Sequence, residues 1–258
     1  DLSENSAGVC IPFSSNTRKL TIKWSVKNDL RMNHMTDAGI KGIDLYERRN
    51  KNWYYIGTGL PDGKENEEIL FKNIKKKQRE FCLFLPLYDT TVNLQIGLDD
   101  GSSFENIIKK TKPLVFYGTS ISQGGCASRP GLAHTNIIFR ELGYECVNLG
   151  FSGNGHLEKP IGTIMSDIDA SLYVIECMYN VDKKMIRERT GALIKSIRAK
   201  PQSKNIPIVF MEQVVIDNGH INTNFISDVV EKNEELNKQI QENINEGEKD
   251  LYIVKHNG

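Results

Sequence analysis

The chain has 258 residues, of which 39% are hydrophobic and 26% are charged, and this composition is typical of a globular protein with a substantial core. Lysine and arginine together number 33, as do aspartate and glutamate, so the formal net charge is zero. A neutral chain has no electrostatic footprint for nucleic acid or for an anionic membrane. No apolar run approaches the roughly 18–20 residues of a membrane-spanning helix. We therefore expect no nucleic acid partner and no membrane span.

The termini and the cysteines bear on the compartment of the protein. The sequence begins at Asp1 without a positively charged and then apolar leader, so we expect a chain trimmed at its start, as after removal of a signal peptide from a secreted or periplasmic protein. The five cysteines have irregular spacing, which favours free thiols over a disulfide framework. No Cys/His pairing predicts a metal site.

Residues 1–108 have the pattern of an antiparallel β-sandwich. Residues 19–26 alternate, with Leu20, Ile22, Trp24 and Val26 on one face and polar side chains on the other, as in a half-buried strand. Further strands are expected at residues 43–46, 53–56, 79–87 and 92–96, separated by turn residues. The four lysines within residues 72–77 are interpreted as the solvated turn of a hairpin, with a binding patch as the alternative.

Residues 109–113 are interpreted as a linker, and residues 114–258 alternate strands with helices. The expected strands are residues 114–117, 145–149, 172–176, 206–211 and 251–254. The expected helices are residues 133–142, 159–166, 182–199 and 224–243. This alternation predicts a doubly wound, flavodoxin-like parallel sheet, and hence an α/β domain after the β-sandwich.

Polar residues follow three strands of the predicted sheet. Ser120 ends the Gly-x-Ser turn after residues 114–117, Gly153 lies in a glycine-rich loop after the second strand, and Asn180 follows the third. The carboxyl edge of such a sheet is where ligands bind. A hydroxyl beside backbone and amide donors is the arrangement that acyl transfer requires, so Ser120, Gly153 and Asn180 are the candidate catalytic residues. The alternatives are ordinary turn residues, with Asn180 capping the helix that begins near Asp182.

These motifs resemble the SGNH superfamily of serine esterases, also called GDSL-like lipase/acylhydrolases. Gly118-Thr119-Ser120 matches the nucleophile block, with Thr119 in place of aspartate, while Gly153 and Asn180 match the glycine and asparagine blocks. Residues 42–46, GIDLY, reproduce the GxDLY signature of a bacterial subfamily with an N-terminal β-sandwich. The resemblance implies hydrolysis of a short acyl ester without a metal or organic cofactor. The expected substrate is an acetyl ester on carbohydrate.

The resemblance also implies an Asp-x-x-His block, which supplies the general base after the fifth strand. Residues 251–258 form the expected fifth strand and its exit, so we expect this block to lie beyond residue 258. Asp217 and His220 have the same spacing but follow the fourth strand, and they are the alternative base pair. His156 and His256 are interpreted as loop histidines.

Three functions remain open from the sequence. The first is a serine esterase. The second is a catalytically silent glycan-binding protein that keeps the fold without the base. The third is a flavodoxin-like binder in which residues 119–125 cradle a phosphate, although no GxGxxG motif supports it. For Asp44, within an apolar strand, we expect a structural role in which its carboxylate accepts hydrogen bonds.

Overall fold

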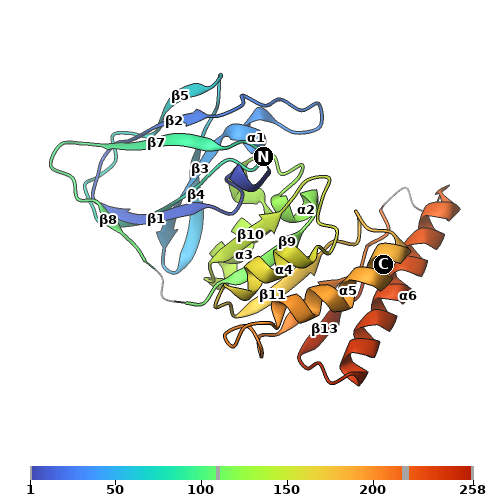
Figure 1. The fold of residues 1–258 in the computed structure, drawn as a ribbon. Coiled ribbons are helices and arrows are strands. Elements are labelled where there is room, and N and C mark those ends of the chain that lie inside the picture. The colour runs from blue at the N-terminus through green and yellow to red at the C-terminus, as the bar shows by residue number, and fades with distance from the viewer. Residues whose placement is uncertain (1, 109–110, 217–220, 257–258) are drawn as a thin grey trace. The chain divides into compact units, whose positions relative to one another are not determined.

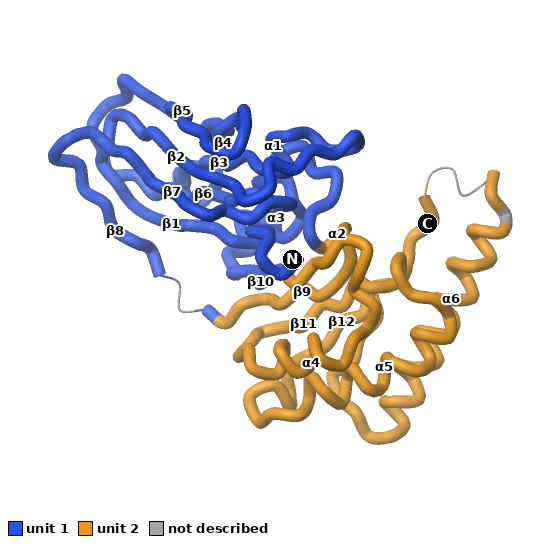
Figure 2. Tube along the Cα trace, turned by 45° about the horizontal axis from the view of Figure 1, so that its top comes forward, with its two compact units in different colours: residues 1–111, 123–148 blue, residues 112–122, 149–258 orange. Residues whose placement is uncertain are grey.

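The computed structural model describes residues 2–108, 111–216 and 221–256. The chain forms two compact units, shown in different colours in Figure 2. The first comprises Asp1–Thr111 with Gln123–Asn148, and the second comprises Lys112–Ser122 with Leu149–Gly258. The structure thus places Gln123–Asn148 with the β-rich unit, which the sequence did not indicate. The predicted domain limits of 1–108, 109–113 and 114–258 stay a prediction.

The first unit is built on two antiparallel sheets, which confirms the sandwich predicted from the sequence (Figure 1). The larger sheet has the strand order β4 (Asn52–Gly59), β3 (Ile43–Arg49), β6 (Arg79–Phe84), β1 (Cys10–Ser15) and β8 (Glu105–Asn106). The smaller has the order β5 (Glu65–Phe71), β2 (Leu20–Val26) and β7 (Thr91–Leu98). The unit also contains α1 (Asp37–Lys41), α3 (His134–Leu142) and the 3-10 turns Leu2–Glu4 and Pro130–Leu132.

Strand β2 shows how the sequence pattern produces the sandwich core. Leu20, Ile22, Trp24 and Val26 are all buried, as the alternation predicted, and they pack with inward side chains of β1, β3 and β6. The intervening Lys23 is exposed. Because side chains alternate across a strand, this register gives one apolar face to the core and one polar face to solvent.

Three strands of the first unit, β1, β5 and the two-residue β8, were not predicted, and the sequences of β1 and β5 lack apolar alternation. Strand β5 is rich in acidic residues, and it pairs only with β2, at the edge of its sheet. An edge strand can present charged side chains to solvent without burying them. Strand β1 contains Pro12, which cannot donate a ladder hydrogen bond. The strand expected at residues 79–87 ends at Phe84, before Pro86.

Asp44 explains the GxDLY signature within the first unit. The side chain is fully buried, and its Oδ2 accepts hydrogen bonds from Arg129 Nη1 at 2.6 Å and from the Gly131 amide at 2.7 Å. Its Oδ1 accepts from Thr58 Oγ1 at 2.5 Å, and Arg129 Nη1 also reaches the Tyr46 hydroxyl at 2.7 Å. The expected structural role is confirmed, because a buried carboxylate requires such partners. These bonds attach residues 129–131 to the larger sheet.

A five-stranded parallel sheet is present, as predicted, and it belongs to the second unit except for residues 146–148 of its strand β10. Its order is β10 (Cys146–Gly150), β9 (Leu114–Gly118), β11 (Leu172–Glu176), β12 (Ile208–Met211) and β13 (Leu251–Val254). Its helices are α2 (Ser120–Gln123), α4 (Lys159–Ser166), α5 (Lys183–Ile197) and α6 (Thr223–Asn245). Helix α5 packs against α4 and α6 (Figure 1). Strand β9 comes first in the chain among these five strands, yet it lies between β10 and β11, which come second and third. The strand order therefore reverses beside β9, and such a reversal opens a crevice at the carboxyl edge of the sheet.

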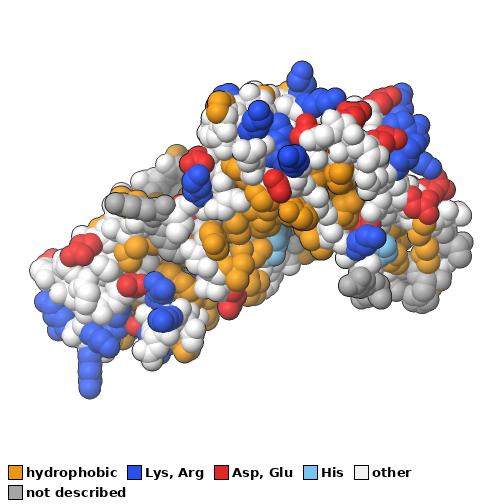
Figure 3. All heavy atoms as spheres, turned by 90° about the horizontal axis from the view of Figure 1, so that it is seen from below, with side chains coloured by type: hydrophobic (Ala, Val, Ile, Leu, Met, Phe, Trp, Pro, Cys, Tyr) orange, Lys and Arg blue, Asp and Glu red, His pale blue; other side chains and the backbone are white. Residues whose placement is uncertain are grey.

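The distribution of surface charges and the state of the cysteines are as the sequence predicted. Basic and acidic side chains are interspersed on the face drawn in Figure 3. All five cysteines are free thiols, as predicted. Among the residues that the structure describes, no helix combines the length and the apolar character needed to cross a membrane.

Candidate active site

Ser120 lies where β9 gives way to a helix. All five residues of β9 are buried, Thr119 is buried as well, and α2 begins at Ser120, which is only partly buried. The chain therefore changes from strand to helix within two residues of Gly118. This tight turn places the Ser120 side chain at the carboxyl edge of the sheet, as the sequence predicted.

Gly118 is required by the packing of this turn. A β-carbon at position 118 would lie 2.3 Å from the carbonyl oxygen of Glu176 and 2.3 Å from Ser122 Oγ. Both distances are far below van der Waals contact, and one of the two atoms belongs to the backbone. Only glycine allows the strand to approach its neighbour this closely before the serine.

Glu176 anchors the same turn, and the sequence analysis missed it. Its Oε2 accepts hydrogen bonds from Thr119 Oγ1 at 2.8 Å, from Ser122 Oγ at 3.0 Å, and from the amides of Ser122 and Thr119 at 3.2 and 3.3 Å. Its Oε1 is buried and has no hydrogen-bond partner among the described residues. Burial raises the pKa of Glu176, although the hydrogen bonds from Thr119 and Ser122 act to lower it. The available signal was a carboxylate ending an otherwise apolar strand.

The loop after β10 lies against the end of β9. The Phe151 amide donates to the Gly118 carbonyl at 3.0 Å, and a β-carbon on Gly155 would lie 2.4 Å from that carbonyl oxygen. Gly153 has a φ of +69°, a conformation that favours glycine, and no atom lies within 4 Å of its missing side chain. The backbone at Gly153 is thus exposed beside open space, where its amide can approach a ligand.

Asn180 is attached to that loop rather than to the next helix. Its Nδ2 donates to the carbonyl oxygen of Asn154 at 2.5 Å. The N-cap of α5 is Asp182, whose carboxylate accepts from the Met185 amide at 2.7 Å. The alternative in which Asn180 caps this helix is therefore wrong. The amide group lies next to the Gly153 loop instead.

The three predicted residues are thus held at the carboxyl ends of neighbouring strands in one unit. Phe151 ties the Gly153 loop to β9, and Asn154 ties Asn180, which follows β11, to the same loop. The arrangement offers a hydroxyl, backbone amides and a side-chain amide at one edge, which are the parts needed to attack a carbonyl and hold the resulting oxyanion. The catalytic roles of the three residues stay a prediction.

Two histidines of the second unit are each paired with a carboxylate. His156 Nδ1 lies 3.5 Å from Glu158 Oε1, and Glu158 also hydrogen-bonds the Tyr117 hydroxyl. His256 Nδ1 lies 2.9 Å from Glu212 Oε2 beside a cavity of about 440 Å³. Burial acts to raise the pKa of Glu212, but hydrogen bonds from Asn237 and His256 outweigh it and lower that pKa.

The remaining candidates concern the base and a metal. Asp217 and His220, the alternative base pair, lie outside the described residues. Across residues 2–108, 111–216 and 221–256, no group of three or more His, Cys, Asp or Glu side chains could hold a metal ion.

Comparison with known families accounts for nearly the whole chain. Residues 111–258 match the sequence model of the GDSL-like Lipase/Acylhydrolase family, and residues 1–104 match that of the N-terminus of Esterase_SGNH_hydro-type proteins, called GxDLY. No curated protein matches the chain.

Three solved structures share this architecture. A protein from Bacteroides ovatus ATCC 8483, provisionally assigned as a GDSL-like lipase, is 33% identical with a TM-score of 0.94, over 99% of this chain and 76% of that one. A family two carbohydrate esterase from Clostridium thermocellum is 10% identical with a TM-score of 0.69, over 98% and 82% of the two chains. An acetyl xylan esterase from Butyrivibrio proteoclasticus is 11% identical with a TM-score of 0.55, over 95% and 80%. The last two likenesses concern the fold alone.

Proposed function

Because the chain belongs to the GDSL-like lipase/acylhydrolase family and is therefore an ester hydrolase, we propose that it removes acetyl groups from carbohydrate with Ser120 as the nucleophile. The observation that carries the proposal is the Ser120 turn, which Gly118 and Glu176 hold at the carboxyl edge of the sheet beside Gly153 and Asn180. A rigid turn of this kind supplies a positioned hydroxyl.

The chemistry then follows from the donors around that hydroxyl. Ser120 Oγ forms a bond to the acyl carbon, and the carbonyl oxygen becomes an oxyanion. The amides of Ser120 and Gly153 and the side chain of Asn180 hold this oxyanion. The Asn180 amide carries two hydrogens, so donating one to Asn154 leaves the other for the oxyanion. A histidine takes the serine proton and passes it to the leaving alcohol, and water then releases acetate from the acyl-enzyme.

The choice of substrate rests on the architecture. Proteins named as a family two carbohydrate esterase and as an acetyl xylan esterase share the fold across both units, at low identity. The name of the second of these proteins gives acetyl as the acyl group, and this supports the choice of a short acyl group. A secreted or periplasmic location would bring such an enzyme to polymeric glycans.

Acetate release tests this function directly. Full-length protein should release acetate from acetylated xylan and should hydrolyse p-nitrophenyl acetate, while the p-nitrophenyl ester of a long-chain acid should react at least about 100-fold more slowly, the scale on which a pocket rejects a poorly fitting group. Ser120→Ala is the control. Faster hydrolysis of the long-chain ester would contradict the proposal. Binding of acetylated xylan without any turnover would favour the catalytically silent alternative.

Replacing Glu176 should damage both stability and turnover. Glu176→Ala leaves the buried donors of Thr119 and Ser122 without their acceptor, so we expect the free energy of unfolding to fall by about 2–4 kcal/mol and kcat to fall with little change in KM. Glu176→Gln retains an acceptor oxygen and should lose less. Urea unfolding and steady-state kinetics measure the two effects.

The raised pKa of Glu176 adds a dependence on pH. A carboxyl whose pKa is higher in the folded than in the unfolded state binds its proton more tightly when folded, so protonation favours folding. Relative to Glu176→Gln, the wild type should gain stability as the pH falls through the folded-state pKa and lose it as the pH rises. An unchanged difference between the two proteins at mildly acidic and mildly alkaline pH would contradict this account.

A further inference from the structure

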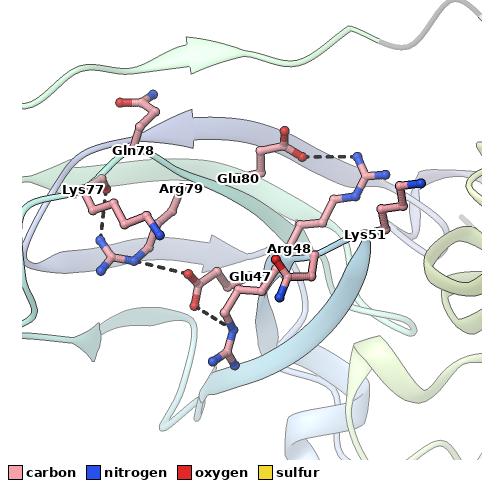
Figure 4. Close-up of a pocket in the computed structure, with 9 residues that line it drawn as sticks. Glu47, Arg48, Lys51, Lys77, Gln78, Arg79 and Glu80 are labelled. Carbon is pink, nitrogen blue, oxygen red and sulfur yellow. Dashed lines mark hydrogen bonds and ion pairs between the residues drawn. The ribbon is translucent and has the colours of Figure 1, made fainter.

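The first unit contains a cavity of about 610 Å³ outside the candidate active site. It is lined by residues 47–51, from the end of β3 and the turn that follows, and by residues 77–80, from the segment that enters β6 (Figure 4). Five lining side chains are cationic and two are anionic, an excess of three positive charges in a chain whose formal net charge is zero. The cavity is therefore a local concentration of positive charge.

Both carboxylates of the cavity are already paired. Glu80 Oε2 lies 3.2 Å from Arg48 Nη1. Glu47 lies between two arginines, 3.2 Å from Arg79 Nε and 3.5 Å from Arg49 Nε, so one negative charge faces two positive ones (Figure 4). The Glu47 and Arg79 side chains are only 13% and 15% exposed, whereas Arg49 is 53% exposed. This half-buried pair is less exposed than the other charged side chains that line the cavity, so the excess positive charge faces solvent.

Arg79 also fixes the backbone beside Lys77, a lysine at the rim of the cavity. Arg79 Nη1 donates to the carbonyl oxygens of Lys75 and Lys77 at 2.9 and 3.0 Å, and this fixes the backbone that carries Lys77. Of the four lysines in residues 72–77, Lys77 lines the cavity. Lys77 is thus the lysine of the run that lines the cavity, and Arg79 holds its backbone.

Lys51 adopts a conformation that lysine rarely takes. The two residues between β3 and β4, Asn50 and Lys51, have φ values of 51° and 72°. A two-residue turn with both φ values positive favours Asn-Gly, so a lysine at the second position is strained. Strained residues of this kind cluster at functional sites, and this lysine points to a use for its ammonium group at the cavity.

We propose that this cavity binds the carboxylate groups of an acidic glycan, such as a chain that contains uronic acid residues. Exposed charges bind a single small anion weakly and are screened by salt, but a polymer that presents many carboxylates gains from repeated rebinding. The positive charge favours carboxylates, while the choice of a glycan over another polyanion rests on the proposed function. The cavity would then hold the glycan through the carboxylates of its sugar residues, whether or not those sugars carry ester groups.

Affinity electrophoresis of the full-length protein in gels containing polygalacturonate tests the site. The Ser120→Ala background prevents hydrolysis from affecting retention. We expect retention by polygalacturonate that weakens with added salt, and little retention by neutral xylan. Lys51→Gly combined with Lys77→Ala should weaken binding about tenfold, as expected for two exposed charges. Lys51→Gly restores the favoured Asn-Gly turn, so its melting temperature should not fall and unfolding cannot explain the loss.

Lys72→Ala is the matched control, because Lys72 belongs to the same lysine run and does not line the cavity. It should bind polygalacturonate within about twofold of the parent. Equal losses for Lys72→Ala and Lys77→Ala would overturn the proposal in favour of nonspecific attraction. Equal retention by single-stranded DNA would overturn the assignment to a glycan. Hydrolysis of p-nitrophenyl acetate, measured for the lysine variants with Ser120 present, should be unchanged, so failure of the site and failure of the proposed esterase function are distinguishable.

Discussion

Ser120→Ala should reduce ester hydrolysis by about 10⁴- to 10⁶-fold while leaving the protein folded, since loss of a nucleophile removes the covalent route and leaves only binding and the oxyanion donors. The side chain is partly exposed at the start of α2, so its hydroxyl is not needed to satisfy a buried core. Initial rates with p-nitrophenyl acetate and a thermal melt measure the two quantities.

Ser122→Ala is the control for this substitution. Ser122 lies two residues further along but is fully buried, and its hydroxyl donates to Glu176 at 3.0 Å. It cannot reach a substrate, so Ser122→Ala should lower stability by about 1 kcal/mol and reduce kcat far less than Ser120→Ala. The reverse order of effects would mean that the nucleophile has been assigned to the wrong serine.

Asn180→Ala should lower kcat about 100- to 1000-fold, or about 2.7–4 kcal/mol, with little change in KM, because a preorganised donor acts mainly on the charge that develops in the transition state. Asn180→Asp should be at least as severe, because it replaces the donor with an anion beside the oxyanion. Steady-state kinetics on the acetyl ester that the wild type hydrolyses best provide the measurement.

Asn154→Ala separates this role from simple loop anchoring. Asn154 accepts the Asn180 hydrogen bond through its backbone carbonyl, which alanine retains. In the part of the chain that the structure describes, its own side chain donates to the carbonyl oxygen of Ser152 at 3.2 Å. The variant should therefore keep most of the activity.

A large rise in KM at constant kcat for Asn180→Ala would instead make Asn180 a substrate-binding residue.

The sequence predicted the parts of the site that depend on local pattern. A buried apolar strand ending at Gly118 indicated both the turn and the partly exposed serine, and the helices beginning near Lys159, Lys183 and Thr223 follow the predicted ranges closely. These features follow from periodicity and turn chemistry within a few residues. The fold class could be predicted for the same reason.

Contacts between distant residues could not be predicted in this way. Glu176 lies 57 residues from Thr119, and its role depends on the pairing of β11 with β9. Arg129 reaches Asp44 across 85 residues, and this bond belongs to the segment that the structure places with the first unit. Strand β5 was missed because pairing with β2, rather than its own acidic sequence, makes it a strand.

Labelling with a fluorophosphonate tests the central assignment most directly, because this probe reacts with activated serine nucleophiles. Full-length protein treated with the probe should carry one adduct, and peptide mapping by mass spectrometry should locate it on Ser120. Ser120→Ala should carry none, and its hydrolytic activity should be lost in parallel. An adduct on another residue, together with activity that survives in Ser120→Ala, would contradict the account.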